Sequence, residues 1–292
     1  MAIYNLGSIN IDYFYKAPHL LKAGETLAAS EISQGLGGKG ANQSVACARS
    51  GAQLYHIGRL HEKDKNWLSF LEQAGVDISH VQLDEEVPTG HAIIIIDETS
   101  GENQILLMAG ANAAIDEELL NKALAHAGPS DWALCQNETN LAVEFLTMAH
   151  QKGLSICYSA APFVKERVLS VLKIVDLLVV NEIEAADIQA ALSKSPEEWG
   201  VPHLIITRGA EGADYFGQEG QFHQAAQKVK AVDTTGAGDT YLGYLLGRLS
   251  CGDTMKQAMA LAASAAAIQV TRMGTAEAIV SLSELKSLNK DG

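Results

Sequence analysis

The sequence predicts an α/β protein in which a predominantly parallel sheet is covered by helices on both faces, with a smaller β-sheet attached. Short apolar runs alternate with helical patterns through most of the chain, and this alternation is typical of parallel βαβ units. Residues 11–34 and 89–108 break the alternation, because each reads as a pair of short strands. With 292 residues and 47% hydrophobic content, the chain can bury a substantial core, and we expect one domain.

The elements of the main sheet follow in order along the chain. Buried strands are predicted at short apolar runs: 3–6, 53–57, 132–135, 155–158, 177–180 and 204–207. Helices are predicted between them, where apolar residues recur with helical spacing: 39–50, 63–74, 117–127, 141–152 and 182–192. In folds of this class, ligands bind beyond the carboxyl ends of the parallel strands.

The two irregular stretches, 11–34 and 89–108, would have to leave the main sheet, and together they could form the smaller one. The second pair of strands is joined by the turn sequence Glu-Thr-Ser-Gly-Glu-Asn. Placed over the ligand end, such a sheet would act as a lid that excludes water from a reaction. Periodicity alone is equally compatible with an ordinary edge hairpin.

Composition limits the classes of function. A net charge of -14 disfavours binding to nucleic acid or to an anionic membrane. No apolar run approaches membrane-spanning length, and the first residues lack the pattern of a signal peptide, so we expect a cytoplasmic protein. The histidines form no H-x-x-x-H pair, which argues against a zinc site. The cysteines form no C-x-x-C pair, which favours reduced thiols at Cys47, Cys135, Cys157 and Cys251.

The segment from Asp233 to Thr240, D-T-T-G-A-G-D-T, precedes a long alanine-rich stretch. Within it, Asp239 follows a Gly-x-Gly turn at the point where a helix is predicted to begin. A helix N-terminus offers unpaired N–H groups and partial positive charge, so it can hold a phosphate or a developing oxyanion. A carboxylate there can also accept a hydroxyl proton, and this combination suggests phosphoryl transfer to an alcohol. Alternatively, Asp239 is only an N-cap.

Residues 35–42, G-L-G-G-K-G-A-N, form a second glycine cluster. The cluster matches G-x-G-x-x-G with Glu62 downstream, but a mixed polar segment precedes it, which argues against a dinucleotide site. It is not a Walker P-loop either, because Lys39 is followed by Gly40. The glycines would let the backbone approach a ligand closely while Lys39 and Asn42 supply donors. Such a loop suits a polyhydroxy compound and a phosphate equally well.

Three further motifs lie at predicted strand ends. Asn10 and Asp12 point to the same side of an extended chain, which suits vicinal hydroxyls, although an Asx turn explains the pattern equally well. Asn181 and Glu184 at a helix start could bind phosphate and hydrated Mg²⁺, or could form an N-cap with an acidic first turn. Residues 204–212 end a buried strand in a glycine-flanked turn that could bind a nucleotide.

Together these motifs resemble the ribokinase-like (PfkB) family of carbohydrate kinases, from Gly7 to about Gly274 and in family order. The pair G-G-K-G-A-N-Q and D-T-x-G-A-G-D-T makes the resemblance specific. It implies a Rossmann-type three-layer core with a β-sheet lid, and ATP-dependent phosphorylation of a primary hydroxyl of a small sugar, with ribose expected. The alternatives are a kinase for another sugar or for a nucleoside, and a sugar- or nucleotide-binding protein without catalytic activity. We also expect a homodimer through the lid, because its exposed edge would otherwise be prone to aggregation.

The resemblance also implies roles for individual residues. The expected catalytic base is Asp239, beside an anion hole formed by Gly236, Ala237 and Gly238. Sugar contacts are expected from Asn10, Asp12, Gly38, Lys39, Asn42, Glu138 and Asp239. Nucleotide contacts are expected from Asn181, Thr207, Gly209, Gly212 and Gly238, and a Mg²⁺ contact from Glu184. A K⁺ site is expected from Asp233 and Thr235 with main-chain oxygens near Gln269, Arg272 and Gly274.

Three positions depart from the family pattern without removing a catalytic residue. Ser159-Ala-Ala-Pro162 stands in place of Asn-Pro-Ala-Pro, which changes the expected phosphate environment. Ala263 replaces a polar residue that is often found near the adenine. Ala278 stands where a Ser usually helps to bind the cation. We therefore expect activation by K⁺ that is weaker than in relatives with that Ser.

Overall fold

A nine-stranded sheet forms the centre of the computed structural model, which describes residues 1–288. Its strands lie in the order β13-β12-β11-β10-β9-β8-β1-β4-β5. The seven strands from β11 to β5 are parallel, and β12 and β13 extend the sheet as an antiparallel pair. The strands are β1 (Ala2–Leu6), β4 (Gln53–His61), β5 (Asp77–Asp84), β8 (Trp132–Cys135), β9 (Ser155–Ser159), β10 (Leu177–Asn181), β11 (His203–Thr207), β12 (Gly212–Gly217) and β13 (Gly220–Ala225).

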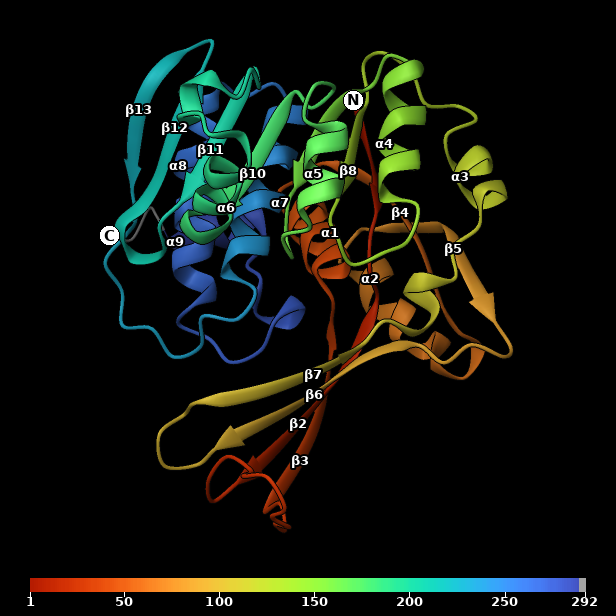
Figure 1. Cartoon of the computed structure of the whole chain (residues 1–292), viewed down its shortest axis with the longest axis vertical. Helices are drawn as coiled ribbons and strands as arrows, with labels where there is room; N and C mark the ends of the chain where they lie inside the picture. Colours follow the sequence, from red (N-terminus) through yellow and green to blue (C-terminus); the bar gives the residue numbers. More distant parts are fainter. Residues whose placement is uncertain (289–292) are drawn as a thin grey trace.

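Helices cover both faces of this sheet, which confirms the predicted three-layer architecture (Figure 1). One face carries α1 (Lys39–Arg49), α2 (Leu68–Gln73), α7 (Ala237–Ser250), α8 (Met255–Gln269) and α9 (Leu282–Leu288). The other face carries α3 (Glu117–Ala123), α4 (Ala142–Gln151), α5 (Lys165–Val171) and α6 (Glu182–Leu192). Over residues 1–288, no helix has the length and apolar character needed to cross a bilayer.

Alternation along the buried strands supplies both layers of the core. In β10, Leu177 and Val179 belong to the cluster under α1, α7 and α8, whereas Leu178 and Val180 belong to the cluster under α3 to α6. All four side chains are buried, as expected for a parallel strand with helices on both sides. The apolar runs of the sequence are therefore continuous because neither face of the sheet meets solvent.

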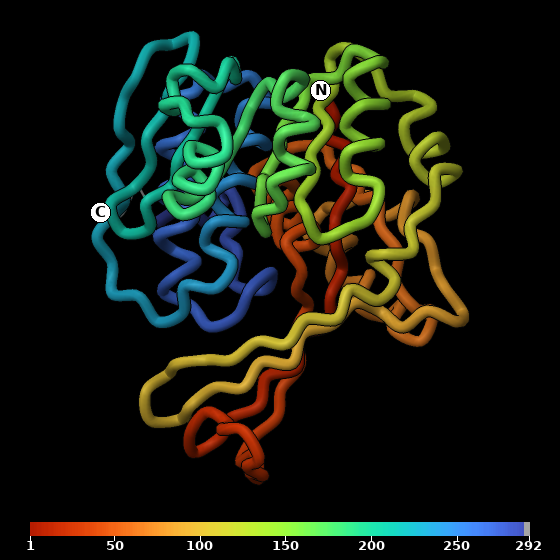
Figure 2. Tube along the Cα trace, viewed as in Figure 1, coloured from red at the N-terminus to blue at the C-terminus, as the bar shows by residue number. Residues whose placement is uncertain are grey.

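A second, four-stranded sheet projects from the core and is called here the small sheet. It contains β2 (Asn10–Ala17), β3 (Glu31–Gly37), β6 (Gly90–Asp97) and β7 (Asn103–Met108), in the order β3-β2-β6-β7. Figure 2 shows the two strand pairs side by side, although about fifty residues separate them in the chain. β2 and β6 pair in parallel at the centre, and each hairpin is antiparallel. Both predicted strand pairs are thus confirmed.

Most predicted elements of the core agree with the structure to within about a residue, and three differ by more. The helix predicted over 63–74 is divided into a 3₁₀ helix, η1 (Glu62–Trp67), and α2. The helix predicted over 117–127 ends at Ala123, because tighter i to i−3 turns lead from there into Gly128 and Pro129. β4 continues past the predicted end at residue 57 because residues 58–61 pair with β5.

Candidate active site

Asp239 lies in the first turn of α7, but its side chain does not cap that helix. The N-cap position belongs to Gly236, which has a φ of 76° and therefore adopts the left-handed conformation that glycine favours. The buried Asp239 carboxylate instead accepts hydrogen bonds from Asn42 Nδ2 at 3.1 Å and from Gln43 Nε2 at 2.9 Å. The alternative that Asp239 is only an N-cap is therefore wrong.

The first turn of α7 presents backbone N–H groups next to this carboxylate. The Ala237 N–H donates to the Thr234 carbonyl at 3.3 Å. This residue was expected to contribute to the anion hole, but its N–H already has an acceptor within the protein. The N–H groups of Gly238 and Asp239 have no acceptor inside the helix, because they belong to its first turn. A Cβ built on Gly238 would meet no heavy atom within 4 Å, so the space beside this turn is open. The helix dipole makes it suitable for an anion.

Close packing of α1 against α7 explains how Asn42 and Gln43 reach Asp239. A Cβ added to Gly243 of α7 would lie 2.4 Å from the Cβ of Ala46 in α1. Two such atoms cannot approach so closely, so any larger residue would push the helices apart. The glycine thus brings the amides of α1 within hydrogen-bond distance of the carboxylate on α7.

A chain of buried amides continues from Asp239 into the main sheet. Gln43 Oε1 accepts from Gln136 Nε2 at 2.7 Å, and the same Nε2 donates to Asn5 Oδ1 at 2.9 Å. Asn5 lies in β1 and in turn donates to the Gly40 carbonyl at 2.9 Å. The sequence-based set omits Asn5, Gln43 and Gln136. Gln43 ends the G-G-K-G-A-N-Q motif and lies on α1. Asn5 and Gln136 are marked in the sequence only as polar residues in or directly after apolar strands.

Glu138 holds the glycine-rich loop at the start of α1. Its Oε2 accepts from Ser8 Oγ at 2.5 Å and from the Lys39 backbone N–H at 2.9 Å. The carboxylate of Asp239 has the largest effect on the Lys39 ammonium and raises its pKa, with further contributions from Glu138 and Glu184 that oppose burial. The Lys39 cation therefore lies in the field of carboxylates from three separate elements of the fold.

Asn10 and Asp12 lie at the start of β2, the strand of the small sheet that follows β1 in the chain. Asn10 Oδ1 accepts from Asn112 Nδ2 at 2.7 Å, a partner that sequence reasoning missed. Asp12 is 7% exposed, and burial, followed by the nearby charges of Glu138 and Glu277, raises its pKa to about 7. No hydrogen-bond donor from residues 1–288 is recorded on the Asp12 carboxylate, so its acceptor sites remain for a ligand.

Asn181 and Glu184 form a reciprocal capping box at the start of α6. The Glu184 N–H donates to Asn181 Oδ1 at 2.8 Å, and the Asn181 N–H donates to Glu184 Oε2 at 2.9 Å. The N-cap alternative is thus confirmed, and Glu184 Oε1 has no hydrogen-bond partner within residues 1–288. Burial raises the pKa of Glu184, while Lys39 lowers it. This single carboxylate oxygen, near the charges of Lys39 and Asp239, fits Mg²⁺ that keeps water and phosphate oxygens as its other ligands.

The expected nucleotide loop follows directly on the same edge of the sheet. Thr207, the last residue of β11, pairs in register with Asn181, the last residue of β10. The chain then turns through η4 (Gly209–Glu211), where Gly209 has a φ of 53° and Gly212 a φ of 113°. The carboxyl ends of the parallel strands thus gather the Asn181, Thr207 and Asp239 regions at one edge, as the fold class predicts.

Two of the main-chain oxygens expected around K⁺, those of Thr235 and Gly274, accept hydrogen bonds from a side chain of the protein instead. Gln269 Nε2 donates to the carbonyls of Gly274 at 2.9 Å, Thr275 at 3.1 Å and Thr235 at 3.4 Å. The Asp233 carboxylate accepts backbone N–H groups from Thr235 at 2.9 Å and Gly274 at 3.2 Å. A cation at this point would have to displace the Gln269 amide, so these residues do not fit a bound K⁺.

Sequence comparison identifies the family. The model for the pfkB family carbohydrate kinases matches residues 3–281. The chain belongs to the pfkB family. Relatives include the ribokinase of Schizosaccharomyces pombe, 35% identical over 96% of this chain and 95% of the relative, and that of Haemophilus influenzae, 33% identical over 94% of each. The deoxyribokinase of Salmonella typhi is 29% identical over 99% of this chain and 100% of its own.

Solved structures of ribokinases share the fold of this chain. The ribokinase of Cryptococcus neoformans in complex with ADP aligns with a TM-score of 0.86 and 28% identity, over 98% of this chain and 99% of that one. The ribokinase of Arabidopsis thaliana complexed with ribose and ATP aligns with a TM-score of 0.83 and 25% identity, over 99% of each chain. As a pfkB kinase, the protein is a carbohydrate phosphotransferase with the ribokinase fold, and the resemblance drawn from its motifs is confirmed.

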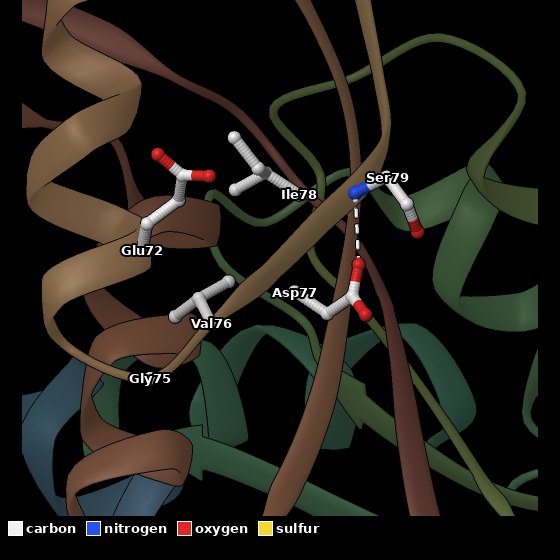
Figure 3. A pocket seen from close by; sticks show the side chains of 6 residues that line it. All are labelled: Glu72, Gly75, Val76, Asp77, Ile78 and Ser79. Atoms are coloured by element: carbon white, nitrogen blue, oxygen red, sulfur yellow. Dashed lines mark hydrogen bonds between the residues drawn. The ribbon is translucent and has the colours of Figure 1, made fainter.

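A hollow of about 500 Å³ elsewhere on this pfkB kinase is not part of the site (Figure 3). It lies where α2 leads into β5, at the amino end of that strand, and is lined by Glu72, Gly75, Val76, Asp77, Ile78 and Ser79. The Asp77 carboxylate accepts the Ser79 N–H at 2.8 Å, as Figure 3 shows. The catalytic motifs lie at the carboxyl ends of the strands, so this hollow carries none of their chemistry.

Proposed function

We propose that this kinase transfers the γ-phosphate of ATP to a primary hydroxyl of a small sugar, with ribose as the first candidate substrate. The observation that carries the proposal is the Asp239 carboxylate, fixed by two amide donors beside the open first turn of α7. Two relatives named above, 35% and 33% identical to this chain, are ribokinases, and a similar solved structure is complexed with ribose and ATP. Both findings support this substrate pair.

In the proposed reaction, Asp239 removes the proton from the attacking hydroxyl. Each carboxylate oxygen accepts one amide hydrogen bond and keeps a lone pair, so the group is oriented without being saturated. The N–H groups of Gly238 and Asp239 would donate to the transferred phosphoryl group as its negative charge shifts. The Lys39 ammonium, held among carboxylates, would balance part of that charge.

Sugar and nucleotide would occupy two neighbouring regions of the site. Asp12 would accept hydrogen bonds from sugar hydroxyls, and the side-chain amide of Asn10 would donate to them. The loop at Gly38 and Glu138 would make further contacts with the sugar. The turn containing Thr207, Gly209 and Gly212 would hold the nucleotide, and Asn181 its phosphates. Glu184 would hold hydrated Mg²⁺, which neutralises phosphate charge when bound.

The small sheet would act as the lid of this site and as a dimer contact. Its edge strand β7 exposes Ile105, Leu106, Leu107 and Met108, each with more than half of its surface accessible. Exposed apolar edges invite pairing or coverage, which supports the homodimer proposal. Sedimentation analysis would test it, and a monomer at micromolar concentration would contradict it.

The free cysteines of the described chain support the reducing, cytoplasmic setting that we also propose.

A substrate panel tests the proposed function directly. A coupled assay for ADP release would compare ribose, 2-deoxyribose, other pentoses and hexoses, and nucleosides. The deoxyribokinase relative and the modest identities favour keeping deoxyribose as the second candidate. We expect the highest kcat/KM with ribose. A preference for a nucleoside would change the substrate within the family, whereas inactivity on the whole panel despite ATP binding would indicate a binding protein without catalysis.

A further inference from the structure

The side chain of Gln269, the last residue of α8, is fully buried and donates its amide to three main-chain carbonyls. The acceptors are Thr235, Gly274 and Thr275, at 3.4, 2.9 and 3.1 Å from Nε2. Three carbonyl oxygens that converge on one point create negative potential there. In a protein, such a cluster needs a donor or a cation at its centre.

The surroundings fix which end of the amide points into the cluster. If the amide were reversed, Oε1 would face three carbonyl oxygens, and all four atoms would repel one another. In the observed orientation, Oε1 is buried and has no hydrogen-bond partner within residues 1–288. The side chain therefore leaves one of its own acceptors unsatisfied in order to satisfy the carbonyl cluster.

The cluster joins the loop after α8 to the catalytic turn. The Thr235 carbonyl belongs to the residue directly before Gly236, the N-cap of α7. Asp233 ties the same two segments together through the N–H groups of Thr235 and Gly274. On the other side, Thr275 Oγ1 donates to the Leu36 carbonyl of β3 at 2.8 Å. Gln269 is thus in direct contact with the backbone that aims the first N–H groups of α7.

We propose that the Gln269 amide is an internal replacement for a monovalent cation, so that the catalytic turn is organised without K⁺. The NH₂ group carries two hydrogens with partial positive charge and occupies the point where the carbonyls converge. Because it is covalently attached, it cannot dissociate when the salt concentration falls. This inference reverses the sequence-based expectation of K⁺ activation and rests on the proposed function, because phosphoryl transfer is its kinetic readout.

The first test asks whether the wild-type enzyme works without K⁺. Its initial rates are measured against KCl, with choline chloride holding ionic strength constant. We expect kcat to change by less than about twofold, since the turn is already preorganised. Gln269→Ala should lower kcat about ten- to a hundredfold in choline chloride, because the carbonyl cluster loses its donor. KCl should then restore most of this loss, since the shortened side chain leaves room for an ion among the same oxygens.

Two further variants separate a positioning role from a merely structural one. Gln269→Met fills the same space without a donor, so its lost activity should not return with KCl. Gln189→Ala, on the exposed face of α6, should behave like wild type. Thermal unfolding provides a readout independent of catalysis: KCl relative to choline chloride should raise the midpoint of Gln269→Ala but not that of wild type or Gln269→Met.

Activation of wild type by KCl of more than about twofold over choline chloride would overturn the proposal and leave the kinase assignment standing. A Gln269→Ala enzyme with normal kcat and no response to KCl would also overturn it. If Gln269→Ala does not fold, the wild-type titration alone still decides. Absence of phosphorylation in every sample would contradict the proposed function instead, while the unfolding midpoints would still test Gln269.

Discussion

The Nε2 atom of Gln43 lies 2.9 Å from Oδ1 of Asp239, across the contact between α1 and α7. Gln43 is itself held by Gln136, and Gln136 by Asn5 in the first strand of the sheet. The orientation of the proposed base is therefore set by a relay of amides that begins in the core. The adjacent Asn42 fixes the second oxygen of the same carboxylate.

Replacing Gln43 with Met should lower kcat about tenfold and leave KM for both substrates nearly unchanged. Met retains the volume of the side chain but removes the donor to Asp239 and the acceptor for Gln136, a loss of roughly 1–2 kcal/mol. Steady-state kinetics with sugar and ATP varied separately would measure this. Gln73→Met, at an exposed position on α2, is the matched control. An increase in sugar KM with unchanged kcat would assign Gln43 to binding instead.

Protonation of Asp12 should control sugar affinity. Its pKa of about 7 means that the carboxylate gains a proton as pH falls from 8 to 6 and then accepts fewer hydrogen bonds. We expect kcat/KM for the sugar to fall over this range, with a much smaller change in KM for ATP. Asp12→Asn should abolish this pH dependence and lower kcat/KM at pH 8 roughly ten- to a hundredfold, since hydrogen bonds to charged groups contribute about 1.5–3 kcal/mol. An unchanged pH profile in the variant would exclude Asp12 as the titrating group.

The same raised pKa predicts an effect on stability. The folded state holds the Asp12 proton more tightly than the unfolded chain does, where the value is near 3.8. The contribution of Asp12 to the free energy of unfolding is thus full below pH 4 and is lost as pH rises through 7. Relative to wild type, Asp12→Asn should gain about 3 kcal/mol of stability between pH 5 and pH 8. Urea unfolding at the two pH values measures this gain, and a constant difference would show that Asp12 has an ordinary pKa.

Much of the fold could be predicted because buried parallel strands are continuous apolar runs, as in β10, and because glycine motifs mark the turns at their ends. The proximity of Asn42 to Asp239 depends on the close packing at Gly243, which a sequence pattern does not reveal. Gln136 and Asn5 carry no motif, so their place in the amide relay emerges only in three dimensions. The predicted K⁺ site used the main-chain oxygen of Gln269. In the structure, the side chain of Gln269 occupies the point where the carbonyls of Thr235, Gly274 and Thr275 converge.

The most direct test of the account is the turnover of Asp239→Asn with saturating sugar and ATP. The substitution removes the base but keeps the volume of the side chain and the backbone N–H groups of α7. We expect kcat to fall at least about 10²–10⁴-fold, while the dissociation constant for ATP, measured by calorimetry, stays within about threefold of wild type. A variant that retains more than a tenth of wild-type kcat would contradict the assignment of Asp239 as the general base.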